Sequence, residues 1–181
     1  MYWRTPRSAV SVRKTVEPKP VLNKAWNPHF YEANSLESWL CVPHDIPGLI
    51  ELCGGEETFL KRLEYTFDGQ HVDPGNEPSF MSTCLYNWVG RPDRTYDRVR
   101  VFMDMFFNGP CGIPGNDDSG AMSSWLAFHI LGIYPNAGQP WYYLHTPSVR
   151  FFTIHLANQM PLGFSSSVPQ PFALLVIFFL R

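Results

Sequence analysis

The chain has 181 residues, of which 45% are hydrophobic and 17% are charged. This composition excludes a disordered chain and suits one domain, or a part of a larger one. The formal net charge of −2 gives no electrostatic basis for binding nucleic acid or an anionic membrane. Aromatic residues reach 15%, which suits a packed core and also a sugar-binding cleft, because pyranose rings stack on flat π surfaces.

The two ends of the chain differ from its middle. Residues 1–30 form an irregular, basic, proline-bearing lead-in without a visible signal-peptide core, so the compartment stays unknown. Residues 157–181 form an atypical apolar tail, in which the apolar run is much shorter than the roughly 20 residues that span a bilayer. The four cysteines contain no C-x-x-C pair, which favours buried free thiols while leaving a disulfide open; they are Cys41, Cys53, Cys84 and Cys111.

Between these ends the sequence predicts short helices separated by glycine and proline. Apolar residues at helical spacing indicate helices over residues 31–42, 47–52, 56–68, 78–89, 95–107 and 119–131. Asp45 is expected to cap the second helix, and Pro43 stops the first. Aromatic and β-branched residues then predict strands over residues 141–145 and 150–156. Helix pairs of this kind build α/α bundles, solenoids or toroids.

The most informative stretch is the turn G-N-D-D-S-G at residues 115–120, which places two adjacent carboxylates directly before a helix. One interpretation is helix capping by Asp118 or Ser119, with the second acid complementing the helix dipole. The other is a carboxylate held on a tight loop, which a glycosidase needs as nucleophile or as base for water. Taken alone, the turn fits capping better, because acidic caps are common.

A second polar stretch covers residues 71–79 and contains H-V-D-P-G-N-E-P-S. Its simplest interpretation is a loop in which Asn76 caps the next helix and Pro78 occupies the first turn. The functional alternative is a calcium site, because Asn76 and Glu77 offer the hard oxygen donors that Ca²⁺ selects. Without other information the loop interpretation is the stronger one.

A third polar stretch precedes and follows the first expected helix. Glu32 and Glu37 fit ordinary solvated helix charges, and Asp45 fits a cap. His44 on its own is more often a hydrogen-bonded structural histidine than a catalyst. No stretch of the sequence resembles a serine or cysteine nucleophile site or a phosphate-binding loop.

Together these stretches resemble the catalytic domain of glycoside hydrolase family 92. Across residues 31–156 the sequence contains, in order, Y-E-A-N-S-L-E, V-P-H-D-I-P-G-L-I-E-L, G-N-E-P-S, Y-N-W-V-G-R-P, G-I-P-G-N-D-D-S-G-A-M-S-S-W and L-G-I-Y-P. The resemblance implies a calcium-dependent exo-α-mannosidase that removes terminal α-linked mannose, from N-glycans or mannosides, with inversion. It also implies a mainly α fold, in which residues 31–156 form a partial (α/α)6 toroid of helical hairpins with a few C-terminal β-strands. The family's N-terminal β-sandwich, to which no stretch of this chain corresponds, is the expected structural partner.

The resemblance also implies roles for single residues in the mechanism. Asp118 matches the general base that activates water, and Asn116 and Asp117 would orient that water or hold Asp118. Glu32 matches the general acid. An inverting enzyme needs its acid and base carboxyls about 6.5–9.5 Å apart, so that a water fits between base and sugar.

The remaining assignments concern the acid, the metal and the sugar. Glu37 and Glu77 are rival candidates for the general acid. Asn76 and Glu77 match the block that contacts calcium. Substrate contacts are expected at four further polar residues, which are His71, Glu37, His44 and Asp45.

Two other functions stay open at this stage. The chain can be a non-catalytic helical fragment that binds glycans or a protein partner, because half a toroid exposes the inner faces of its helices. It can also belong to a different toroidal glycosidase that uses the same pair of carboxylates. For the 181 residues alone no turnover is expected, whereas a protein with an intact upstream domain is expected to cleave an aryl α-mannoside.

Overall fold

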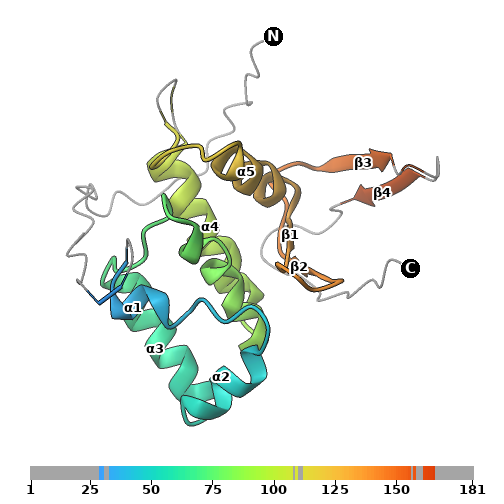
Figure 1. The fold of residues 1–181 in the computed structure, drawn as a ribbon. Coiled ribbons are helices and arrows are strands. Elements are labelled where there is room, and N and C mark those ends of the chain that lie inside the picture. Colours follow the sequence, from blue (N-terminus) through green and yellow to red (C-terminus); the bar gives the residue numbers. More distant parts are fainter. Residues whose placement is uncertain are drawn as a thin grey trace, which may run out of the picture.

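The computed structural model describes residues 29–30, 33–107, 109, 112–155, 157 and 161–165. Over these ranges the chain is mainly helical and ends in two antiparallel hairpins (Figure 1). Its elements are α1 (Ser35–Ser38), α2 (Ile46–Leu52), α3 (Glu56–Asp68), η1 (Glu77–Ser79), η2 (Ser82–Val89), α4 (Pro92–Phe106), α5 (Ala121–Leu131), β1 (Ile133–Pro135), β2 (Tyr142–Leu144), β3 (Phe151–His155) and β4 (Pro161–Ser165). None of the described helices combines the length and apolarity needed to cross a bilayer. Nearly all of the expected lead-in and most of the apolar tail lie outside the described residues.

The central helices begin where local sequence signals predict. Asp45 caps α2, because its carboxylate accepts a hydrogen bond from Gly48 N at 2.9 Å. Glu56 and Glu57 occupy the first turn of α3, where negative charge meets the positive end of the helix dipole. α4 begins three residues before its predicted start, at Pro92, a position at which the missing amide hydrogen of proline leaves no helical bond unmade.

Two of the predicted helices are wrong in extent or kind. In place of a helix over residues 31–42, the described part forms only the four-residue α1, which Asn34 caps by accepting hydrogen bonds from Leu36 N and Glu37 N. The segment 78–89 forms the 3₁₀ helices η1 and η2 instead of one α-helix. Since η2 packs against both α3 and α4 and residues 82–86 are all buried, tertiary packing overrides helix propensity there.

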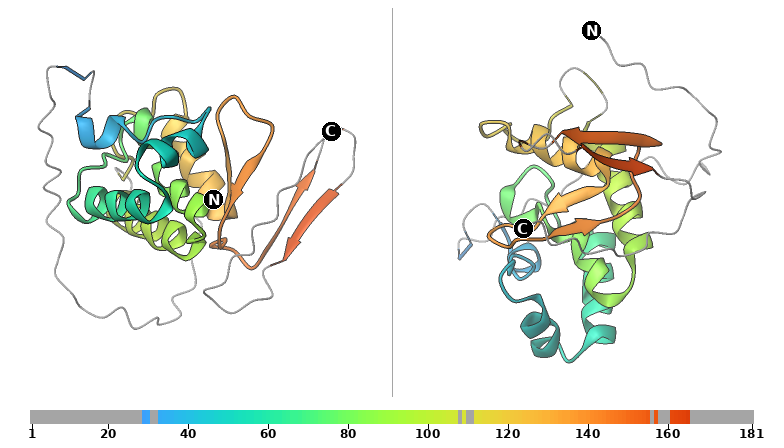
Figure 2. Two further views of the ribbon diagram at one scale, coloured as in Figure 1. Left: turned by 90° about the horizontal axis from the view of Figure 1, so that it is seen from below. Right: turned by 90° about the vertical axis from the view of Figure 1, so that its right-hand side faces the viewer.

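The strands form two separate antiparallel hairpins. The predicted strands at 141–145 and 150–156 are confirmed as β2 and β3, whereas β1 and β4 were missed. Proline lies in both missed strands, and glycine in β4, so neither shows the residue pattern of a strand. Figure 2 shows the β3–β4 hairpin on the far side of the β1–β2 hairpin from α1–α3. Exposed and half-buried residues alternate along β3, so neither face of this strand is fully covered.

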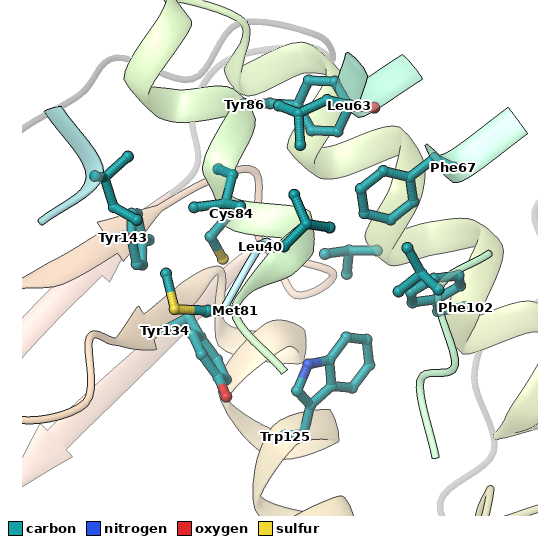
Figure 3. Packing of buried hydrophobic residues seen from close by; sticks show 14 of the residues in the cluster. Leu40, Leu63, Phe67, Met81, Cys84, Tyr86, Phe102, Trp125, Tyr134 and Tyr143 are labelled. Atoms are coloured by element: carbon teal, nitrogen blue, oxygen red, sulfur yellow. The ribbon is translucent and has the colours of Figure 1, made fainter. Parts of the chain in front are cut away.

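A cluster of buried apolar side chains joins the helices to the first hairpin. Phe67 of α3 lies 5.6 Å from the ring of Tyr86 and 5.9 Å from that of Phe102. Trp125 of α5 stacks on Phe107 with ring centroids 5.6 Å apart. Figure 3 shows Phe67, Phe102 and Trp125 converging from three helices. Because the large aromatic rings interlock, the start of α5 is held at a fixed position relative to α3 and α4.

The cysteines follow the sequence prediction only in part. Cys53 and Cys84 are buried free thiols, as predicted, but Cys41 is a free thiol on the surface. Burial raises the pKa of the Cys84 thiol to about 12, so this thiol stays protonated and inert near neutral pH. Cys111 lies outside the described residues.

Two buried histidines connect α5 to the residues that follow β2. His129 Nδ1 and His145 Nε2 lie 2.9 Å apart, and His145 Nδ1 lies 3.1 Å from the Thr146 carbonyl oxygen. A carbonyl can only accept, so His145 Nδ1 donates to it, and His145 Nε2 then accepts from His129 Nδ1. Burial lowers the pKa of His145 to about 4 and holds the pKa of His129 well below its usual range. Both rings are therefore neutral in the folded protein near neutral pH.

We expect the free energy of unfolding to fall as the pH drops from about 6.5 towards about 4. Unfolded histidine binds a proton with a pKa near 6.5, while the folded pKa of His145 is about 4. Unfolding thus takes up protons in this window, so the stabilisation is complete above it and is lost on acidification. Urea unfolding across this pH range measures the slope.

Two variants separate the buried pair from the carboxylates that also titrate in acid. His145→Gln keeps an acceptor for His129 and is expected to flatten the slope. His155→Gln changes an exposed histidine on β3 and is expected to keep it. An unchanged slope in H145Q would contradict this explanation.

Candidate active site

The loop of residues 71–79, which follows α3 and ends with the short helix η1, is hydrogen-bonded on one side to the segment that carries α1. Glu37 of α1 is buried, with 2% of its surface exposed. Its carboxylate accepts hydrogen bonds from Asp73 N, at 2.9 Å, and from the Ser79 hydroxyl. The Asn34 amide adds a long contact, 3.5 Å, to the carbonyl of His71. Two of the three polar stretches singled out in the sequence are therefore in direct contact.

On its other side the same loop touches the acidic turn, backbone against backbone. A Cβ on Gly115 would collide with the carbonyl oxygen of Gly75, and a Cβ on Gly75 would lie 3.0 Å from Gly115 N. Gly115 also has a φ of +63°, in the left-handed region that glycine adopts without penalty. The approach thus excludes a side chain at Gly115 and leaves little room for one at Gly75. Through this contact the third polar stretch joins the other two.

Within the turn, Asp117 is the residue that caps α5. Its Oδ1 accepts hydrogen bonds from Ser123 N at 3.0 Å and from Ser123 Oγ at 2.8 Å. The Asp117 carbonyl also accepts from Gly120 N and Met122 N, at 3.0 and 3.3 Å. The assignment of the cap to Asp118 or Ser119 is wrong: Gly120 is the N-cap residue and makes no side-chain bond, while Asp117, three residues earlier, provides the acceptor for the first turn of α5.

The second acid, Asp118, has no comparable task in the fold. Its side chain is exposed, and no hydrogen bond joins its carboxylate to any other described residue. The φ angles of Asp118 and Ser119 are +44° and +60°, a left-handed conformation that costs L-residues roughly 1–3 kcal/mol each. Such strain is concentrated at functional sites, because a fold seldom keeps it otherwise.

The structure does not place the other predicted site residues that it describes in contact with the acidic turn. Glu32 lies outside the described residues, so its distance from Asp118 stays a prediction. His71 is half-buried at the start of the central loop. His44 and Asp45 are exposed, and Asp45 is used as the cap of α2, which Figure 1 places at the opposite end of the helical part from α5. The structure therefore does not bring these two residues beside the acidic turn.

Comparison with known proteins relates most of the chain to the family that its sequence blocks resemble. A family model described as the glycosyl hydrolase family 92 catalytic domain matches residues 3–168. The chain belongs to glycoside hydrolase family 92. The matched range extends beyond residues 31–156 at both ends.

Relatives of this family 92 chain are much longer than the chain itself. An uncharacterized secreted glycosidase of Arthroderma benhamiae is 43% identical over 118 residues, which are 65% of this chain and 15% of that protein. A family 92 α-mannosidase of Bacteroides thetaiotaomicron superposes with a TM-score of 0.69 and 30% identity, over 81% of this chain and 21% of that one. An inverting mannosidase of the family, from Bacteroides thetaiotaomicron VPI-5482, gives 0.67 and 29%, over 78% and 23%. The chain thus spans less than a quarter of the length of each of these relatives.

The donors expected to bind calcium lie on the loop that borders the acidic turn. Asn76 is 8% exposed and is the N-cap residue of η1, as predicted, but its side chain makes no capping hydrogen bond to that helix. Glu77 is exposed. Ca²⁺ takes about six to eight oxygen ligands, and the described part of this family 92 chain brings no three His, Cys, Asp or Glu side chains together as a metal site. The described residues alone do not form a complete calcium site.

Sequence analysis did not find the contacts that assemble the site. The sequence D-P-G does indicate a turn, and Asp73 Oδ1 accepts a hydrogen bond from Gly75 N at 2.9 Å. The partners of Glu37 and of Gly75 are distant in the sequence, and no local signal identifies them.

We expect the two acids of the turn to affect stability in opposite ways. Asp117→Ala removes the cap and is expected to lower the free energy of unfolding by about 1 kcal/mol. Asp118→Gly relieves left-handed strain and is expected to raise it by up to about 1 kcal/mol. Urea unfolding with unchanged m-values measures both. A loss in D118G as large as that in D117A would mean that Asp118 also supports the fold.

Proposed function

We propose that the protein containing this segment hydrolyses terminal α-linked mannose, from N-glycans or simpler mannosides, and that Asp118 is the general base. The observation that carries the proposal is the division of the acidic turn, in which Asp117 caps α5 while Asp118 stays exposed on strained backbone. Two solved family 92 relatives are named as mannosidases, one of them as inverting. A carboxylate without a structural partner is what such a reaction requires of its base.

In the proposed reaction Asp118 takes a proton from a water molecule as that water attacks the anomeric carbon of mannose. The attack comes from the face opposite the leaving oxygen, so the configuration inverts. Asn116, exposed beside Asp117, orients the water. Asp117 holds the turn in place in this scheme, because its Oδ1 accepts both hydrogen bonds from Ser123.

We assign the general acid to Glu32 and not to Glu37. Glu37 is almost fully buried, and its carboxylate accepts hydrogen bonds from Asp73 and Ser79. It would have to release the central loop before it could reach a sugar, so we assign it to holding that loop. Glu77, exposed on the same loop, remains the rival acid. The acid protonates the leaving oxygen and needs a desolvated environment that keeps it protonated beforehand.

We further propose that Asn76 and Glu77 provide some of the ligands of a calcium ion, with the others coming from outside the described residues. Both follow Gly75 directly, and Gly75 touches the acidic turn at Gly115. The bound ion would supply positive charge and coordination for sugar hydroxyls. His71, at the start of the loop, is the proposed sugar-contacting residue nearest to these donors in the chain.

We also propose that the described helices belong to an (α/α)6 toroid whose other helices lie outside this segment. We propose that a β-sandwich domain packs against this segment. The exposed apolar residues Phe151, on β3, and Leu52, at the end of α2, are 80% and 86% exposed and suit contact with further protein. The same exposure supports the second candidate function, in which the segment binds a glycan or protein partner without catalysis.

We expect Asp118→Asn to lower the hydrolysis of an aryl α-mannoside by about 10²- to 10⁴-fold in the complete protein that contains this segment. Asparagine tolerates left-handed backbone, so the fold is kept while the base is lost. Glu51→Gln, which changes an exposed acid on α2, is the control and is expected to keep full activity. Full activity in D118N would refute the assignment of the base.

Two further measurements belong to the same assay. EDTA is expected to abolish activity, and added Ca²⁺ to restore it; activity that resists EDTA would refute the calcium proposal. The 181-residue chain alone is expected to show no measurable turnover, because it spans only 15% of the length of its curated relative. Robust turnover by this chain would show that the segment needs no further domain.

A further inference from the structure

We infer that Gly75 and Gly115 are positioning residues, whose backbone contact sets the spacing between the loop that carries Asn76 and the turn that carries Asp118. The inference rests on the proposed function for its catalytic meaning, but the contact itself is independent of it. A Cβ on Gly115 would meet the carbonyl oxygen, carbonyl carbon and Cα of Gly75, all of them backbone atoms that cannot rotate away.

The two partners of the contact are each fixed to the rest of the fold. On the loop side, Glu37 accepts the hydrogen bond from Asp73 N. The loop is also closed internally, because Asp73 Oδ1 accepts from Gly75 N at 2.9 Å. These hydrogen bonds restrict the movement of the loop away from the turn.

On the turn side, Asp117 is bound to Ser123 in the first turn of α5. Trp125, one helical turn into the buried face of α5, donates from Nε1 to the Phe80 carbonyl at 3.0 Å. Phe80 directly follows η1, at the end of the central loop. Turn and loop are thus tied to each other through α5 where the loop ends, and the glycine contact fixes the separation where the site residues lie.

This spacing matters because the proposed reaction needs groups from both segments around one mannose unit. Asp118 comes from the turn, while Asn76 and Glu77 come from the loop. A misplacement of about 1 Å between catalytic groups can lower a rate by roughly 100-fold. An added methyl group at the contact would push the two segments apart by a distance of this order, without touching a reacting atom.

The test compares Gly115→Ala with Gly138→Ala in the complete protein. Gly138, in the turn between β1 and β2, has a φ of +73° and nothing within 4 Å of a Cβ. Both substitutions therefore carry the same backbone strain, but only G115A forces a collision. We expect kcat on an aryl α-mannoside to fall by about 100-fold in G115A, with KM changed far less, and to stay near the unsubstituted value in G138A. Gly75→Ala, at a residue without positive φ, is expected to lower kcat in the same direction by a smaller factor.

Hydrogen exchange gives a readout that does not depend on activity. In G115A the amides of residues 71–79 are expected to exchange faster, whereas in G138A they are expected to exchange as in the unsubstituted protein. Unchanged exchange in this loop, together with a kcat equal to that of G138A, would overturn the inference. Faster loop exchange in a protein that never cleaves α-mannosides would support the contact and refute the proposed function instead.

Discussion

The close approach of Gly75 to Gly115 is the contact on which the candidate site depends. Two loops that are distant in the sequence meet there through backbone atoms, with no space for a Cβ on Gly115 and little for one on Gly75. Side-chain contacts can adapt to substitution by changing rotamers, but a backbone contact cannot. The contact therefore fixes the position of the acidic turn relative to the neighbouring loop, which is the kind of preorganisation that the proposed reaction would need.

The adjacent acids of the turn differ in their structural roles, and under the proposed function the second of them is free for catalysis. Asp117 satisfies amide and hydroxyl donors at the start of α5, as a helix N-terminus requires. That bond also holds Asp118 and Ser119 in left-handed conformations, which would relax in a free loop. The Asp117 carboxylate thus stabilises the start of α5 and also helps to keep the backbone of Asp118 in its left-handed conformation. Buried Glu37 has a similar task for the opposing loop.

The elements that sequence analysis predicted well are those whose signals are local. Asp45 at the start of α2 and Pro92 at the start of α4 act within one turn of their own position. The prediction of one α-helix over residues 78–89 was wrong. The conformation of this segment depends on its packing against α3 and α4, which the local sequence does not reveal. β1 and β4 were missed because proline is untypical of strands, and because their strand conformation depends on pairing with β2 and β3.

The candidate site, too, was predicted from the sequence only where its signals are local. Residue types and family blocks identified the acidic turn and the loop at 71–79, since their chemistry is visible in a few adjacent letters. Which acid caps the helix was not predictable, because either carboxylate of the pair could reach the first turn. The contacts of Glu37 with Asp73 and of Gly75 with Gly115 were missed, because they depend on long-range folding.

The most direct test of this account is a through-space NMR measurement on glycine-labelled protein. A nuclear Overhauser effect between the Gly115 amide hydrogen and the α-hydrogens of Gly75 reports the contact itself, whatever the protein catalyses. The account predicts a strong cross-peak, because the Gly115 nitrogen lies 3.0 Å from the position of a Gly75 Cβ. A folded protein in which this cross-peak is absent, while the Trp125 indole hydrogen still shows its proximity to Phe80, would contradict the account.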